Sequence, residues 1–560
     1  MHTTTGSEGA VDALTRQNIA QALWMKEYEK SSIPPDILQK IESEKNSDRS
    51  FAARFQTHLR EMMDNLPSFV TSRADRYKVM LRHAESRSPQ QCYASTLCLG
   101  PESVTGYEAI PLDPKFGFPG IDCPQGKTQV GWHFFVGNFI DELQHHYSVE
   151  LMLWRYALLP PDLAARLGLS EQDNQMVELQ LAISDPQAQV PYRANPAVVA
   201  GTTGLVDWRA HPYSYAMGRN RIGSLDQSAN LFPARLVARG WDMGKTPNVE
   251  IEIDLALDSV KGYFLEGQDG CAPSIDGIGT LYYSAPLLKL SPGHESAITI
   301  GGARKRLVEG SMWYDHQWGT GFMPAGAPRH AVMRASQNLS PAGPGGWDWF
   351  MMQFHRNDAI SPDGEVQLTL SALHTIANES YYWQTGPTPP GVMTASCTGK
   401  YIDAQRQVHN VTGVMQVTQW VRSTASPNPA LYPASNTWYP AKYQFMVDGP
   451  IPEPIRLLTV TPIIASGQTG FFATGIQYTE GGAVITDNWG REMGRGFAEG
   501  TNYADTTANV IRLAGLPEDQ QTLGFLKAPK VGPLMKIWSL IYVFFNKAEL
   551  DKILAEAKGL

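Results

Sequence analysis

Short strand-like runs, separated by turn residues, recur through most of this 560-residue chain. Residues 131–140 and 147–155 are two such runs, and the polar segment 141–146 between them predicts a β-hairpin. Further strand-like runs lie at 249–257, 279–284 and 298–300. The 50 glycines and 39 prolines supply the turns that such a series needs. The pattern therefore predicts a mostly β protein.

The strand-like runs form two blocks. The Pro/Gly-rich segment 341–346 ends the first block, and a second series begins at residue 347 and continues to about residue 503. Two blocks of short strands joined by a linker predict two antiparallel β-barrels or sandwiches in tandem. We place the first β domain at 95–340 and the second at 341–515.

The two ends of the chain differ from these blocks. Apolar residues recur at helical spacing within 11–90, which predicts a helical N-terminal extension over 1–94. A C-terminal helix is expected within 516–560, where 533–545 is apolar nearly all round. That segment is too short to span a bilayer. It is either an anchor for peripheral membrane contact or a helix buried against the β domains.

Composition excludes several classes of function. A net charge of -9 without a basic run argues against nucleic acid as a partner. The five cysteines form no C-x-x-C pair, so neither a zinc site nor a disulfide framework is indicated. No phosphate-binding or dinucleotide fingerprint occurs, and we expect chemistry without a cofactor. The polar N-terminus lacks the apolar core of a secretory signal, which makes a cytoplasmic location the expectation.

The segment 310–319, GSMWYDHQWG, combines two ionisable side chains with three aromatic ones. It favours a strand, and side chains alternate between the two faces of a strand. One face would carry Trp313, Asp315 and Gln317, and the other Tyr314, His316 and Trp318. An acid beside an aromatic wall suits proton transfer to an apolar, electron-rich substrate.

This segment resembles the W-x-D-H-x-W-G hallmark of the hydroxyneurosporene synthase (carotenoid 1,2-hydratase) and AttH-like family, which also includes kievitone hydratases and lipocalin-type Diels–Alderases. Segments that follow the order of the family are 131–155, 265–270, 282–286, 346–350, 438–440 and 494–499. The resemblance covers about residues 105–510 and implies two lipocalin-like (calycin) barrels. The hydratase branch carries a histidine shortly before an Ala-Pro pair, whereas the corresponding stretch 281–286 reads LYYSAP.

The motif and the resemblance together predict a cofactor-independent lyase or cyclase. Its substrate would be a hydrophobic, unsaturated metabolite such as an isoprenoid or polyketide, which it would hydrate, dehydrate or cyclise. Asp315 would be the general acid, with a pKa raised by apolar surroundings, and His316 would be its partner. Aromatic faces would stabilise a carbocation. The expected substrate-binding residues are Trp313, Tyr314, Trp318, Tyr283, His133 and Trp132.

Three alternatives remain open at this point. A barrel can accelerate a pericyclic reaction by folding a polyene into a reactive conformer, with Asp315 or His316 only hydrogen-bonding a carbonyl. The chain could instead be a non-catalytic carrier that binds a lipid or pigment. Asp315 and His316 could also belong to a buried structural network that closes the barrel.

Overall fold

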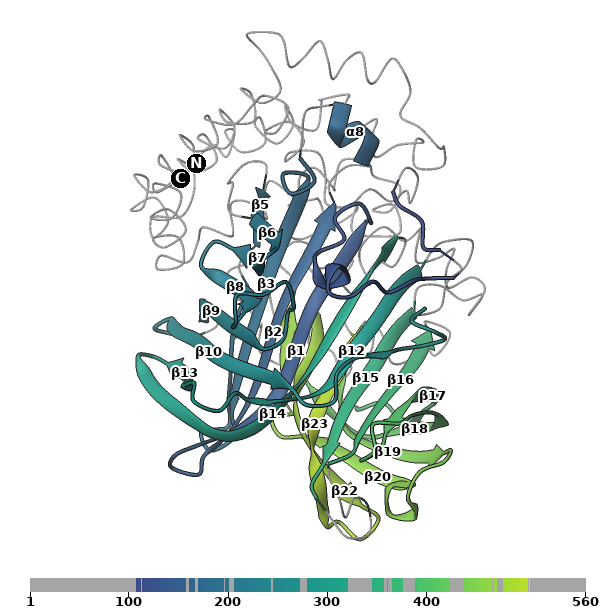
Figure 1. The fold of residues 1–560 in the computed structure, drawn as a ribbon. Coiled ribbons are helices and arrows are strands. Elements are labelled where there is room, and N and C mark those ends of the chain that lie inside the picture. Colours follow the sequence, from purple (N-terminus) through teal and green to yellow (C-terminus); the bar gives the residue numbers. More distant parts are fainter. Residues whose placement is uncertain are drawn as a thin grey trace, which may run out of the picture.

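The structure, a computed structural model, consists almost entirely of strands (Figure 1). It describes residues 107–503 except 112, 158–160, 167–169, 196, 201–205, 243–244, 272–278, 321–344, 357–359, 361–364, 376–387, 424–437, 466, 471–476 and 502. The helices expected within 1–94 and 516–560, including the segment 533–545, lie outside the described residues. None of the described helices is long and apolar enough to cross a membrane.

The first sheet contains 14 strands, all from residues 130–320. They are β1 (Val130–Asp141), β2 (His146–Ala157), β3 (Gln175–Asp185), β4 (Val190–Ala194), β5 (Ala197–Val199), β6 (Val206–Ala210), β7 (Tyr213–Met217), β8 (Asn220–Ser224), β9 (Ala234–Asp242), β10 (Val249–Ser259), β11 (Phe264–Leu265), β12 (Gly279–Leu290), β13 (Ser296–Ile300) and β14 (Ala303–Thr320). The short helices η2 (Gly120–Asp122) and α8 (Pro161–Arg166) accompany them. The predicted hairpin is confirmed, because β1 and β2 pair antiparallel.

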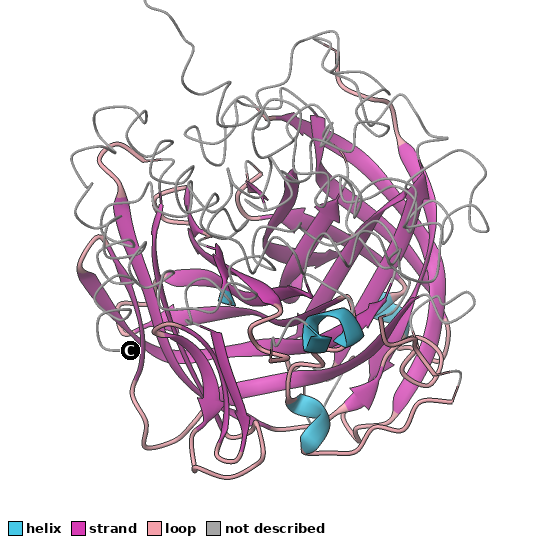
Figure 2. Ribbon diagram, turned by 90° about the horizontal axis from the view of Figure 1, so that it is seen from above, coloured by secondary structure: helices cyan, strands magenta, loops and turns pink. Residues whose placement is uncertain are grey.

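This sheet curves into the first barrel. Its main order is β4-β3-β2-β1-β14-β12-β10-β9-β8-β7-β6. At one end, β4 lies against β9 and β10, and the backbone N–H of Arg193 donates to Asp242 Oδ2 at 3.1 Å. The curvature of the strands is visible from above (Figure 2).

The second sheet contains nine strands and also forms a barrel. They are β15 (Gly345–Phe354), β16 (Gln367–Thr375), β17 (Met393–Ile402), β18 (Val408–Arg422), β19 (Trp438–Asp448), β20 (Leu457–Pro462), β21 (Gln468–Gly470), β22 (Gln477–Asp487) and β23 (Glu492–Thr501), with the short helix η4 (Glu453–Ile455) before β20. Pairing of β20 with β22 closes the ring. The border predicted between residues 340 and 341 falls outside the described residues, between the last strand of one sheet and the first of the other.

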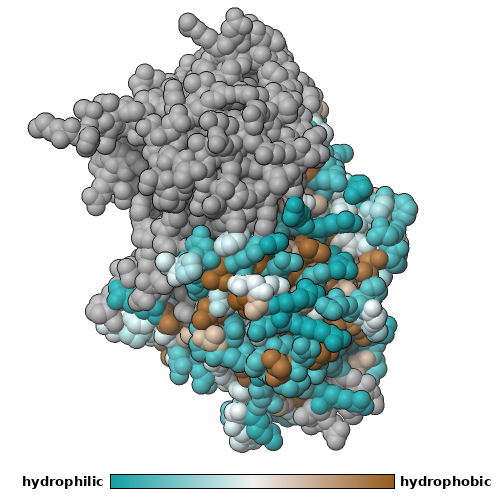
Figure 3. Space-filling view, turned by 90° about the vertical axis from the view of Figure 1, so that its left-hand side faces the viewer, coloured by the Kyte–Doolittle hydropathy of each residue, from teal (hydrophilic) through white to brown (hydrophobic). Residues whose placement is uncertain are grey.

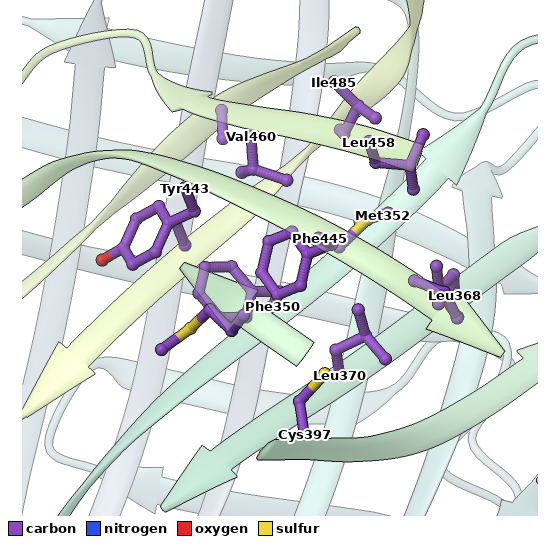
Figure 4. Packing of buried hydrophobic residues seen from close by; sticks show 14 of the residues in the cluster. Phe350, Met352, Leu368, Leu370, Cys397, Tyr443, Phe445, Leu458, Val460 and Ile485 are labelled. Carbon is purple, nitrogen blue, oxygen red and sulfur yellow. The ribbon is translucent and has the colours of Figure 1, made fainter. Parts of the chain in front are cut away.

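Alternating residues of the second sheet fill its barrel. On β15, Phe350 and Met352 point inward, where they meet Tyr443, Phe445 and other apolar side chains (Figure 4). The ring of Phe350 lies 4.7 Å from that of Tyr443 and 4.8 Å from that of Phe445. Aromatic contacts at this distance add to the apolar area that the residues bury.

The two barrels pack directly against each other. Strand β23 contacts β1, and β22 contacts β2 and β3 (Figure 1). Ser311 Oγ donates to Gln353 Oε1 at 2.6 Å, and Lys261 Nζ donates to the carbonyl oxygens of Glu365 at 2.6 Å and Asp403 at 2.8 Å. One face of β1, β2 and β14 is therefore covered by the second barrel, while the opposite face lines the first barrel.

The described surface in Figure 3 is mainly hydrophilic, with apolar residues in small groups between polar ones. Scattered exposed apolar residues are normal for a folded protein. The part of this face that the structure describes therefore shows no extended apolar patch.

Candidate active site

The predicted division of the motif between two faces is confirmed. On β14, Asp315 pairs with Phe134 of β1 and Ser284 of β12. The next residue, His316, pairs with His133 and Tyr283 on the same two strands. Because neighbouring rows point to opposite sides of a sheet, Asp315 faces the second barrel and His316 faces the interior of the first.

The Asp315 carboxyl group is 2% exposed and lies among three hydrogen-bonding side chains. Its Oδ1 accepts from Trp313 Nε1 at 2.6 Å and from Ser284 Oγ at 2.5 Å. The hydroxyl of Tyr282 lies 2.6 Å from Oδ2. Burial raises the pKa of Asp315 to about 7, against the opposing effect of these hydrogen bonds. Asp315 can therefore hold a proton near neutral pH.

A second carboxyl group adjoins this one. Glu266, directly after β11, is buried, and Ser284 Oγ lies 3.2 Å from its Oε1. Burial, followed by the charge of Asp315, raises the pKa of Glu266 to about 8. The Ser284 hydroxyl has one proton to donate. When Ser284 donates to Asp315, a protonated Glu266 can donate to Ser284, so the three groups form a proton relay.

Aromatic rings from both barrels surround the acid. The ring of Trp313 lies 5.7 Å from Phe264 and 6.2 Å from Trp349, which belongs to β15 of the second barrel. Phe134 lies 5.6 Å from Trp349. These rings form the apolar wall that keeps Asp315 away from water. Tyr282 is only half buried, and its hydroxyl contacts the Asp315 carboxyl group.

His316 belongs to a separate cluster inside the first barrel. Its ring centroid lies 3.9 Å from that of His133 and 4.5 Å from that of Trp318. His316 Nδ1 lies 3.2 Å from the hydroxyl of Tyr283. Burial lowers the pKa of His133 to about 3 and that of His316 well below its ordinary value, so both imidazoles are neutral at pH 7.

The prediction that His316 is the partner of Asp315 is wrong. The alternation of the strand sends the two side chains to opposite faces, and the hydrogen bonds of Asp315 come from Trp313, Ser284 and Tyr282 instead. A catalytic role for His316 by itself stays a prediction.

Asp122 of η2 organises this interior cluster. Its carboxylate accepts from Tyr283 and, at 3.2 Å, from Tyr263. Its backbone oxygen lies 2.7 Å from His133 Nε2 and accepts from the Tyr213 hydroxyl at 2.9 Å. Burial raises the pKa of Asp122 to about 6. The residues around His316 therefore hold η2 in the first barrel. This arrangement agrees with the alternative in which His316 belongs to a buried structural network.

The part of the chain that contains both clusters is similar to a known family of proteins. Residues 111–361 match the model of a family described as AttH-like. This part of the chain is similar to the AttH-like family. It contains the acid cluster and the interior histidine cluster together with the first strand of the second barrel.

Two solved structures are similar to this chain. One is described as a putative AttH from Nitrosomonas europaea, with 15% identity and a TM-score of 0.50, covering 71% of this chain and 100% of that one. The other is kievitone hydratase from Nectria haematococca, with 11% identity and a TM-score of 0.43, covering 71% of this chain and 96% of that one. The likeness to AttH shows a shared fold. No protein of curated function matches the sequence.

The structure divides the predicted substrate-binding residues into two groups. Trp313 and Trp132 share the face of Asp315. Tyr314, Trp318, Tyr283 and His133 lie on the interior face of the first barrel, as His316 does. The substrate-binding roles of all of them stay predictions, but one small substrate cannot contact both faces of β14.

Sequence reasoning missed three residues of the acid cluster: Tyr282, Ser284 and Glu266. The alternation within 281–286 shows that Tyr282 and Ser284 share a face, but not that this face carries Asp315. That assignment needs the register of β12 against β14, which pairs Ser284 with Asp315. Among the described residues, no group of three or more histidine, cysteine, aspartate and glutamate side chains could hold a metal ion.

Proposed function

We propose that this AttH-like protein is a cofactor-independent hydro-lyase that adds water to, or removes it from, a hydrophobic unsaturated metabolite such as an isoprenoid or polyketide. The observation that carries the proposal is the buried Asp315 carboxyl group, whose pKa burial raises to about 7 and which contacts the half-buried Tyr282. Protonation of a carbon–carbon double bond requires such a donor in apolar surroundings.

The proposed hydration step uses Asp315 and Tyr282 in turn. Protonated Asp315 donates from Oδ2 to the Tyr282 oxygen, and the Tyr282 hydroxyl transfers its own proton to one alkene carbon. The positive charge that forms on the other carbon is stabilised by aromatic ring faces, by about 0.5–2 kcal/mol for each ring that it contacts. Water adds to that carbon and loses a proton, which returns through Tyr282 to Asp315. Dehydration follows the same path in reverse.

The rate should depend on pH. Because only protonated Asp315 can donate, we expect hydration to proceed at its full rate below pH 7 and to fall by about tenfold per pH unit above the pKa of about 7. Initial rates measured between about pH 5 and 9 test this expectation. A flat profile would favour a pericyclic reaction, in which no proton is transferred.

Replacing Tyr282 by Phe should interrupt the transfer of a proton from Asp315 to the substrate. The variant keeps the aromatic ring but removes the hydroxyl that lies 2.6 Å from Asp315 Oδ2. We expect kcat to fall by about 10²-fold, within the usual range for a proton-transfer group. Tyr283→Phe is the matched control, because that hydroxyl lies on the other face and contacts Asp122. A larger loss of kcat in Tyr283→Phe would contradict the role of Tyr282.

The direct test is incubation of the purified protein with an extract of apolar metabolites, followed by mass spectrometry. A hydro-lyase yields a product that differs from its substrate by the mass of one water molecule, and Asp315→Asn forms this product at least about 100-fold more slowly. An isomer of unchanged mass would overturn hydration in favour of cyclisation. A ligand that is bound and released unaltered would identify a carrier.

A further inference from the structure

A second polar cluster lies between the barrels, on the strands β3, β4 and β22. It contains Arg193 of β4, Gln180 of β3 and Glu480 of β22. Within the described part of the chain, five atoms of these side chains are buried without a hydrogen-bond partner: Nε and Nη2 of Arg193, Nε2 of Gln180, and both carboxyl oxygens of Glu480. Buried polar groups are nearly always satisfied in folded proteins, and each exception calls for an explanation.

The three side chains converge on one place. Arg193 pairs with Ala182, which in turn pairs with Glu150, so Arg193 and Glu150 share the face that meets the second barrel. The hydroxyl of Tyr478, two residues before Glu480, contacts Gln180 Oε1 and lies 3.2 Å from Glu150 Oε1. Arg193 therefore extends from the first barrel towards a strand of the second.

The backbone at Gly467 passes close to the guanidinium group, and the absence of a side chain there permits this approach. A side chain there would begin 3.5 Å from Arg193 Nη2 and 3.0 Å from the backbone oxygen of Glu480. Gly467 thus places Arg193 and Glu480 on either side of the same position in the chain. The guanidinium group can donate hydrogen bonds and the Glu480 carboxyl group can accept them, yet no hydrogen bond joins the two groups.

The unsatisfied groups define the chemistry of a ligand. The Nε and Nη2 atoms form the edge of the guanidinium group that binds a carboxylate through two parallel hydrogen bonds. Gln180 Nε2 is a further donor. Burial, followed by the charges of Glu499 and Glu150, raises the pKa of Glu480 well above its ordinary value, so Glu480 also offers a proton. Donors from three side chains match an acceptor with two oxygens.

We propose that Arg193, Gln180 and Glu480 form a binding site for an organic carboxylate between the two barrels. Arg193 binds both carboxylate oxygens through Nε and Nη2, and Gln180 and Glu480 each donate one further hydrogen bond. The site is built from residues other than the Asp315 cluster, and it does not depend on the proposed hydro-lyase reaction.

The charge of the surroundings sets the conditions for binding. Burial raises the pKa of Glu150 to about 7 and that of Glu499 to about 8, and it raises the pKa of Tyr478 well above its ordinary value. Asp242, near Arg193, lies 3.9 Å from the ammonium group of Lys245. At about pH 6 the buried glutamates are mainly neutral and Arg193 keeps its charge, whereas above about pH 8 they ionise and repel an anion.

The test is calorimetric titration of the full-length protein with benzoate at about pH 6, with benzamide as the uncharged ligand of the same shape. We expect the wild type to bind benzoate at least about tenfold more tightly than benzamide. Arg193→Lys loses the pair of parallel N–H donors and should bind benzoate about tenfold more weakly than the wild type. Arg235→Lys is the matched control, because Arg235 pairs with Asp254 in another part of the first barrel. Its affinity should equal that of the wild type.

Further variants separate this proposal from the hydro-lyase reaction and from a purely structural role. Glu480→Gln, which keeps the shape of the side chain, should bind benzoate at about pH 6. When the pH rises to about 8.5, its affinity for benzoate should fall less than that of the wild type. Asp315→Asn should bind benzoate like the wild type even though turnover is lost. Absence of benzoate binding to the wild type at millimolar concentrations, or equal affinities of Arg193→Lys and the wild type, would overturn the proposal.

Discussion

Asp315→Asn is expected to lower kcat by about 10²–10⁴-fold, the usual contribution of a general acid. Asparagine keeps the shape of the protonated carboxyl group. Its amide oxygen can accept from Trp313 and Ser284, and its amide nitrogen can donate to the Tyr282 oxygen, in the places where Oδ1 and Oδ2 now lie. The fold is therefore retained, while the transferable proton is lost. Steady-state kinetics with the substrate found in the metabolite extract measure the effect.

Stability provides the control for this variant. The folded-state pKa of Asp315 is raised, so ionisation is less favourable in the folded protein than in the unfolded chain. The wild type therefore loses stability as pH rises from about 4 to about 7, and Asp315→Asn removes this loss. At about pH 8 the variant should be at least as stable as the wild type, as measured by urea unfolding.

A matched substitution distinguishes the acid from buried carboxyl groups in general. Asp348 of β15 is fully buried in the second barrel, where Tyr503 lies 2.9 Å from both carboxyl oxygens, and burial raises its pKa well above the ordinary value. Asp348→Asn should retain kcat. Undiminished turnover in Asp315→Asn, or an equal loss in both variants, would contradict the role of Asp315 as the acid.

Arg155→Ala is expected to lower the free energy of unfolding by about 3–5 kcal/mol, as is typical when a large buried side chain with several hydrogen bonds is removed. The guanidinium group is buried inside the first barrel and donates to the carbonyl oxygens of Gln125, Thr128 and Val130 and to the side chain of Gln175. Without Arg155, these acceptors stay buried without a donor and a cavity opens.

Urea denaturation of Arg155→Ala, followed by tryptophan fluorescence, measures this effect. Arg235→Ala is the control, because its ion pair with Asp254 is partly exposed and should contribute no more than about 1 kcal/mol. If the two variants lost stability equally, the network around Arg155 would not be needed to hold the segment before β1 in the barrel.

Local patterns in the sequence were sufficient for several features. Strand alternation placed Asp315 and His316 on opposite faces, and the polar segment after residue 140 predicted the hairpin of β1 and β2. Both features depend only on neighbouring residues, since the two-residue period of a strand and the turn of a hairpin are local. The same reasoning failed where it paired His316 with Asp315, because it did not apply the alternation to the catalytic roles.

Long-range pairing decided the environment of the acid. The groups around Asp315 come from β12, from the residue after β11 and, through Trp349, from the second barrel. Strand register and the packing of one barrel on the other bring them together, and neither can be read from local periodicity. The tertiary structure also decided which face of β14 lines the first barrel and which meets the second.

By itself, then, the sequence determined that this chain forms two blocks of strands. It also determined that one strand carries an acid and a histidine on opposite faces. Only the tertiary structure decided that the acid lies between two barrels, next to Ser284, Glu266 and Tyr282. The physical reason is that the pKa of a carboxyl group depends on burial and on neighbours far away in the chain. Residue identity sets which chemistry is available, and packing sets which group performs it.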